Sequence, residues 1–259
     1  MINKTVEISN LSLGLAFVMV VISLVISYQQ KLGLEKETLI SVARAIVQLI
    51  VVGYLLRFVF HVNNLVLTIT MMAFILFNAS YNGEKRARGI SHSLRISFVA
   101  LLLGGGTTML LLVLTGAIKP VPWQLVPVTG MVMNNAMIAV GLVYRSLGQM
   151  YTDQKNQVFE RLALGANPKE ASGDIIKQAI KFGMQPTIDS IKTLGLVSLP
   201  GMMSGLIMAG VEPVLAIKYQ IMVTFMILSS TALSSVYASY AAYKRFFDEN
   251  WVLQLPKDK

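Results

Sequence analysis

The feature that most constrains this sequence is a series of apolar runs, each long enough to cross a lipid bilayer. A hydrocarbon core of about 30 Å takes roughly 20 helical residues. Seven runs of this kind lie at Ile8–Tyr28, Thr38–Phe60, Asn64–Ser80, Leu94–Ile118, Trp123–Tyr144, Ile191–Gly210 and Val214–Tyr243. Because lipid offers no partner to an open backbone, each run is predicted to be a helix. We expect an all-α integral membrane protein with seven transmembrane helices, forming one domain over residues 1–259.

The composition agrees with that fold class. Hydrophobic residues make up 54% of the chain and charged residues only 14%, whereas soluble domains carry about 25% charged residues. The chain has no Cys, which removes disulfides, thiolate metal sites and Cys-based catalysis. The formal charge of +9 is typical of basic cytoplasmic loops, so no nucleic-acid partner is expected.

The Lys and Arg residues also predict an orientation. When a basic residue within five positions of a span end is counted with the adjoining segment, the segments after spans one, three, five and seven hold 2, 4, 7 and 4 of them, whereas the amino terminus and the other segments hold one each. Only Arg44 is left, inside span two. Basic loops stay in the cytoplasm, so we expect a multi-pass protein of the cell (plasma or inner) membrane. Its amino terminus is predicted to lie outside and its carboxyl terminus in the cytoplasm.

The longest segment between spans is a polar loop at about residues 146–190, between spans five and six. Asn167 is a good N-cap, Pro168 suits the first helical position, and Glu170 can complete a capping box. Gly165 is expected to break a preceding helix, and Gly183 to end the following one. Each of these helices carries an apolar stripe: Val158, Phe159, Leu162 and Ala166 on the first, and Ile175, Ile176, Ala179 and Ile180 on the second. Such stripes lie on lipid headgroups or dock a soluble partner, and the residues alone leave both open.

Two resemblances to known families favour docking of a soluble partner over contact with lipid headgroups. Glu160, the string from Leu164 to Pro168, and Ile175-Ile176 together resemble the EAA-type coupling loop of ABC transporter permeases, although the chain is one residue shorter between its Glu and Gly. The residues that this resemblance marks for coupling to an ATPase are Glu160, Leu162, Leu164, Gly165, Ala166, Asn167, Pro168, Ile175 and Ile176.

The second resemblance covers almost the whole chain. Asn134-Asn135-Ala136-Met137, the string LGLVSLPGMMSG at residues 194–205, Glu212-Pro213 and Tyr219-Gln220-Ile221 are similar to the FetB-type family of iron-export permeases, which includes plant permeases linked to aluminium tolerance. The resemblance implies a homodimeric permease subunit that exports a metal ion, iron. ATP and Mg would bind to a separate ATP-binding cassette subunit. In agreement, the sequence has no G-x-x-x-x-G-K-[ST] loop for nucleotide phosphates, so this chain is not expected to be an enzyme or to hold a cofactor.

Polar and sulfur-containing residues inside the spans are the candidates for a translocation pathway, because intramembrane polar groups are costly and face protein or water. Arg44 and Gln48 share one face of span two. Asn134 and Asn135 are adjacent, about 100° apart on a helix, so at most one can face a pore squarely. Pro200 is expected to kink span six at its middle. The full set is Arg44, Gln48, Asn134, Asn135, Pro200, Met202, Met203 and Glu212.

Each of these positions also has a structural explanation that involves no translocation pathway. Arg44 can snorkel to headgroups, the Asn pair can bond neighbouring helices, Glu212 can be a solvated loop charge, and Met is a common core filler. Thioethers suit Cu(I) better than Fe(II), and with two His and no Cys the metal-binding residues remain unknown. The alternatives to an ABC permease are an ATP-independent transporter or channel, and a non-transporting membrane scaffold.

Overall fold

The structure is a computed structural model and describes residues 9–87 and 89–255. Within those residues all regular secondary structure is helical, with two isolated β-bridges that join Leu194 to Ser198 and Phe247 to Leu253. Six of the described helices are long and apolar enough to cross a membrane. The predicted all-α membrane class is confirmed. The chain divides after Asn63 into two compact units, which are treated separately below, and the single domain stays a prediction.

The first unit is a pair of helices, α1 (Asn10–Gln29) and α2 (Glu35–Val62). Ser9 caps α1, because its Oγ accepts from the amide of Leu11 at 3.2 Å. Ser27 near the end of α1 donates to Glu35 Oε1 at 2.9 Å, which fixes the start of α2. These helices correspond to the first two predicted spans, although Ile8, the expected start, lies outside the described residues.

The second unit packs its helices around one long central helix, α6 (Pro122–Asp153), which contacts α3 (Leu65–Glu84) and α11 (Pro213–Ala242) along its length. The fourth predicted span is a continuous rod made of α4 (Ser93–Leu101), a π-helical turn η1 (Leu102–Gly106) and α5 (Thr107–Leu114). A short 3₁₀ turn, η2 (Tyr243–Phe246), follows α11. Four predicted spans therefore appear here as helices, with boundaries shifted by a few residues.

The glycines of η1 allow close helix contact, as expected for a Gly-rich stretch inside a span. A Cβ on Gly104 would overlap Ser234 Oγ on α11, and one on Gly105 would lie 2.6 Å from Met133 Cε on α6. Ser234 in turn donates to the carbonyl of Ala100 at 2.9 Å. The π-helical turn therefore joins the fourth span directly to α6 and α11.

The sixth predicted span, a continuous helix at Ile191–Gly210, is wrong. Instead α9 (Gly173–Thr193) ends where that span should begin, residues 194–200 are non-helical, and α10 (Gly201–Met208) follows. Gly195 has φ +78°, a left-handed conformation that glycine adopts without steric cost. Pro200 has no amide hydrogen and disfavours helix at the residue before it, so it stands as the N-cap of α10 and not at a mid-helix kink.

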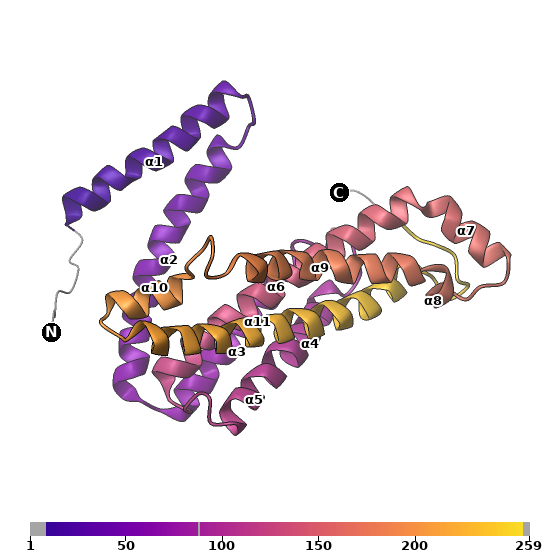
Figure 1. Cartoon of the computed structure of the whole chain (residues 1–259). Helices are drawn as coiled ribbons and strands as arrows, with labels where there is room; N and C mark the ends of the chain where they lie inside the picture. The colour runs from indigo at the N-terminus through magenta and orange to yellow at the C-terminus, as the bar shows by residue number, and fades with distance from the viewer. Residues whose placement is uncertain (1–8, 88, 256–259) are drawn as a thin grey trace. The chain divides into compact units, whose positions relative to one another are not determined.

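The expected helix end at Gly183 is also wrong, because α9 runs on through Gly183 and Pro186. Gly183 permits a close approach to α6 and α11: a Cβ there would lie 2.7 Å from Val143 Cγ2 and 2.9 Å from Ser235 Oγ. Packing thus outweighs the local preference of Gly183 to end a helix. In Figure 1, α9 runs antiparallel to α6 and α11, which point the same way. The chain must therefore return between them through α9, the break and α10.

Candidate functional site

The predicted loop folds into a compact structure that we call the bracket, residues 155–180. It consists of α7 (Lys155–Ala163), a turn, α8 (Pro168–Ala171) and the first part of α9 (Figure 1). Gly165 makes the turn with φ +92°. Asn167 Oδ1 accepts from the amide of Glu170, and Glu170 Oε2 accepts from the amide of Asn167, both at 3.0 Å. The predicted capping box is confirmed, with Pro168 as the first residue of α8.

An ion pair holds the two sides of the bracket together. Arg161 on α7 donates to Asp174 Oδ2 on α9 at 2.8 Å, and its second terminal nitrogen donates to the carbonyl of Ala171 at 3.4 Å. This hydrogen bond, together with the positive charge of Arg161, lowers the pKa of Asp174. The pair is solvent-exposed, so it orients the bracket more than it stabilises the protein.

Apart from the exposed Phe159, the apolar stripes of the bracket pack on the protein itself, which neither alternative from the sequence had included. Val158, Ile175 and Ile176 are each at most 2% exposed and belong to the main core, which Leu162 and Ala166 pack against. Leu164, in contrast, is 88% exposed at the turn. The exposed surface of the bracket is therefore this turn together with Phe159 and Glu160, and not the isoleucine stripe.

The carboxyl-terminal segment closes the same end of the core. Phe246 of η2 stacks on Tyr151 near the end of α6, with ring centroids 4.3 Å apart. Phe247 contacts the same ring edge-on at 5.9 Å and forms the β-bridge to Leu253, which is buried. The base of the bracket is thus fixed between α6, α11 and the residues that follow α11.

A cavity of about 320 Å³ lies at the other end of α9, between α6, α9, the break and α11. Its apolar wall includes Ile138, Ile191 and Ile227. Six uncharged polar side chains also line it: Asn135, Thr187, Ser190, Ser198, Gln220 and Thr224. Among the described residues, none that lines the cavity is ionisable.

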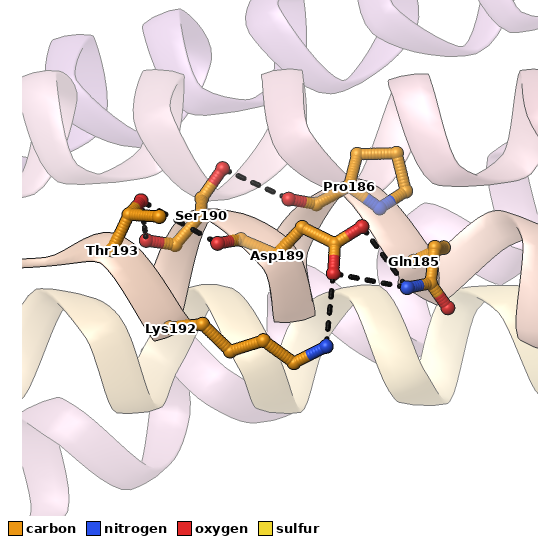
Figure 2. Close-up of polar contacts among 6 residues, drawn as sticks. All are labelled: Gln185, Pro186, Asp189, Ser190, Lys192 and Thr193. Atoms are coloured by element: carbon orange, nitrogen blue, oxygen red, sulfur yellow. Dashed lines mark hydrogen bonds and ion pairs between the residues drawn. The ribbon is translucent and has the colours of Figure 1, made fainter.

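Three of these six side chains donate a hydrogen bond to a carbonyl of their own helix. Asn135 Nδ2 donates to the carbonyl of Met131, Ser190 Oγ to that of Pro186, and Thr224 Oγ1 to that of Gln220, each at 2.8 Å. Figure 2 shows the bond from Ser190. Gln220 Oε1 is buried and lacks a hydrogen-bond partner within the described part of the chain.

Asp189 lies next to cavity-lining Ser190 but is already paired. Gln185 Nε2 donates to both of its carboxylate oxygens at 3.0 Å, and Lys192 Nζ donates at 3.0 Å (Figure 2). Residues 9–87 and 89–255 contain no group of three or more His, Cys, Asp or Glu side chains that could hold a metal ion.

The structure brings together two of the eight predicted pathway residues, Asn135 and Pro200, both at the cavity. Asn134 is exposed and does not line the cavity. Glu212 is exposed at the start of α11.

The other predicted pathway residues lie elsewhere. Met202 packs against a second apolar cluster around Val132 and Met226, and Met203 is half-buried on α10. Arg44 and Gln48 belong to α2 of the first unit, where both are exposed.

Sequence reasoning missed five polar residues of the cavity as pathway candidates: Thr187, Ser190, Ser198, Gln220 and Thr224. Gln220 and Thr224 carried a usable signal, because they are polar residues four apart inside the seventh apolar run, as Arg44 and Gln48 are in the second. Thr187 and Ser190 carried none, since their segment was assigned to the loop.

A multi-span helical protein whose chain breaks beside an uncharged polar cavity has the architecture of membrane transport proteins, in which discontinuous helices form substrate sites. The chain belongs to a membrane protein family described as "Uncharacterised protein family (UPF0014)", whose model matches residues 10–247.

Three relatives show how far the similarity extends. The chain is 51% identical to "Probable iron export permease protein FetB" of Escherichia coli (strain K12), over 93% of each chain. It is 36% identical to "Protein ALUMINUM SENSITIVE 3" of Arabidopsis thaliana, over 92% of this chain and 88% of the relative. The rice protein "UPF0014 membrane protein STAR2" is 35% identical, over 90% and 81%. No solved structure matches the chain.

Proposed function

We propose that this protein is the membrane-spanning permease subunit of an ABC transporter, exporting a metal ion, iron, with ATP hydrolysed by a separate subunit. The bacterial relative named as an iron export permease supports the cargo and direction. The absence of a phosphate-binding G-x-x-x-x-G-K-[ST] motif from the sequence supports a partner that binds ATP and Mg. The working unit is a homodimer with two ATPase subunits in the cell membrane, its bracket and carboxyl terminus in the cytoplasm.

One observation carries this proposal: α9 connects the bracket to the cavity without interruption. It begins at Gly173, beside the capped turn, and ends at Thr193, where the break and the cavity start. Its 21 residues span about 32 Å at 1.5 Å per residue. Movement of the exposed turn by a docked ATPase would therefore reach the cavity through one helix that is packed on both α6 and α11.

The direct test is to purify the chain from its native membrane, identify any bound ATPase, and measure ATP hydrolysis by the pair with and without Fe²⁺. Co-purification of an ATP-binding cassette subunit and Fe²⁺-stimulated hydrolysis are expected. Metal flux into vesicles that contain this chain alone, without nucleotide, would instead identify an ATP-independent transporter. Unchanged cellular metal content on deletion and overexpression would identify a scaffold.

A further inference from the structure

A groove with a volume of about 390 Å³ lies between α5 and α11 on the surface of the second unit. Its α11 wall runs from Lys218 to Ser229 with side chains spaced three or four residues apart, so they share one face of the helix. Gln220 and Thr224, which line the cavity described above, lie on the opposite face of α11. The groove is therefore a separate feature.

The groove is open because the fourth span and α11 are in close contact only at η1. Gly104 brings the two elements together at Ser234, whereas contacts between α5 and α11 are sparse. Met226 is buried and forms part of the floor, and the exposed Leu111 and Phe225 form the two sides. Both walls belong to helices that are long and apolar enough to cross the membrane, so the groove faces lipid.

Lys218 is the only charged residue among the described residues that line the groove. It is exposed in the second turn of α11, and it belongs to neither of the ion pairs within the described part of the chain. A cation inside an apolar span is costly unless its ammonium group reaches the headgroups or an opposite charge. The groove therefore has a place for an anionic group at this end.

The length of the groove matches one leaflet of a bilayer. Lys218 and Ser229 are eleven positions apart, which is about 16 Å along a helix at 1.5 Å per residue. Half of a hydrocarbon core of about 30 Å is about 15 Å. Lys218 lies near the start of α11, at the end of the second unit opposite the bracket. An acyl chain along the apolar wall would thus place its headgroup phosphate beside Lys218.

The charge of Lys218 favours a lipid over a second copy of the chain as the occupant. A two-fold interface presents the same patch from both subunits, so an interface centred on this groove would bring two Lys218 side chains together. Among the described residues that line the groove, none is Asp or Glu, so neither copy would supply the opposite charge.

We propose that the groove between α5 and α11 binds one anionic phospholipid of the leaflet opposite the bracket. Its phosphate pairs with Lys218, and one acyl chain lies against Ile221, Phe225 and Leu111. The bound lipid fills the space where the fourth span and α11 separate, and it should stabilise their packing. This inference goes beyond the proposed function, because the site requires neither an ATPase nor a transported metal.

Lipid binding is tested on the full-length chain purified in detergent, with two probes that have the same acyl chains. Palmitoyl-oleoyl phosphatidylglycerol is anionic, and palmitoyl-oleoyl phosphatidylcholine carries no net charge. Native mass spectrometry measures the affinity of each lipid, and thermal denaturation measures the stabilisation, because a ligand that binds only the folded state raises the melting temperature. The first phosphatidylglycerol should bind more tightly than phosphatidylcholine and raise the melting temperature further. Glycerol 3-phosphate, which has no acyl chain, should not displace it.

Two Lys variants locate the site. Lys218→Gln keeps most of the side chain and removes the charge, so it should weaken phosphatidylglycerol binding about fivefold, as expected for one basic residue at a lipid surface. Phosphatidylcholine binding should change little. Lys119→Gln is the matched control, because Lys119 is exposed at the same end of the second unit but does not line the groove. Without lipid, both variants should melt as the parent does.

Four outcomes would overturn the proposal. They are equal binding of the two lipids to the parent, an unchanged preference in Lys218→Gln, an equal loss in Lys119→Gln, and displacement of the lipid by glycerol 3-phosphate. Because the chain has no Cys, Ile221→Cys tests the second copy directly. A disulfide that forms readily between two copies of this variant in lipid nanodiscs would assign the groove to a dimer interface and remove the lipid site.

Discussion

Two apolar side chains of the bracket have opposite surroundings, although both belong to the segment that resembles a coupling loop. Ile176 is 1% exposed, within the core, whereas Leu164 is 88% exposed beside Gly165. A partner can reach only the second without unfolding the first. Coupling and stability should therefore be separable at the level of single residues.

Leu164→Ala should leave the melting temperature of the purified chain unchanged and reduce Fe²⁺-stimulated ATP hydrolysis in the complex at least tenfold. Ile176→Ala, in contrast, should lower the free energy of unfolding by about 2–5 kcal/mol, because it leaves a cavity in the core. Both variants are measured by thermal denaturation and by ATPase assay of the complex. Full coupling by Leu164→Ala would show that the exposed turn is not the docking surface.

Gly183 gives a second residue-level prediction. A Cβ there would lie within 3.0 Å of atoms from both α6 and α11, so Gly183→Ala should destabilise the protein by about 1–3 kcal/mol through overpacking. Gly173→Ala is the control, because a Cβ at that helical position meets nothing within 4 Å and Ala favours helix. Equal melting temperatures for the two variants would contradict the close packing of α9.

At the scale of elements, the helix cap and the turn could be predicted from the sequence because their interactions join residues close together in the chain. The capping box of Asn167 and Glu170 and the turn at Gly165 required only neighbouring residues, and the structure has both. The helix end at Gly183 was wrong because tertiary contacts decided it, whereas the continuous sixth span was wrong although Gly195 and Pro200 carried a local signal for the break. Gly183 faces distant residues of α6, and the cavity oxygens of α9 and α11 meet only in the folded chain.

The two sides of the bracket should separate in acid. The pKa of Asp174 is lowered in the folded protein by Arg161, so the pair contributes above the unfolded value, about 3.9, and is lost as the pH falls through the lower folded value. Because the chain has no Cys, a spin label on Leu164→Cys reports bracket motion alone. Its mobility should be constant from pH 8 to pH 5 and rise below about pH 4. Adding Asp174→Asn should make the mobility of the label high at every pH. A mobility that does not change with pH in the protein with Asp174 intact would contradict the role of the Arg161–Asp174 pair.

At the scale of the whole second unit, the direction of its long helices fixes which loops share a side of the membrane. Since α6 and α11 point the same way (Figure 1), the segments that precede them must lie on one side and the bracket and carboxyl-terminal segment on the other. This requires α9, the break and α10 to cross the bilayer together as one interrupted span. Seven crossings stay a prediction, in which the sixth is not a single helix.

Single cysteines in this Cys-free chain test that topology in intact cells and inverted vesicles. Lys119→Cys and Glu212→Cys, which precede α6 and α11 and are exposed, should react with a membrane-impermeant maleimide from outside. Leu164→Cys and Asn250→Cys, also exposed, should react only from the cytoplasmic side. If α9 and α10 did not cross together, Glu212→Cys would instead be labelled from the same side as Leu164→Cys. Labelling of Lys119→Cys from the cytoplasm would reverse the orientation that the basic loops predict.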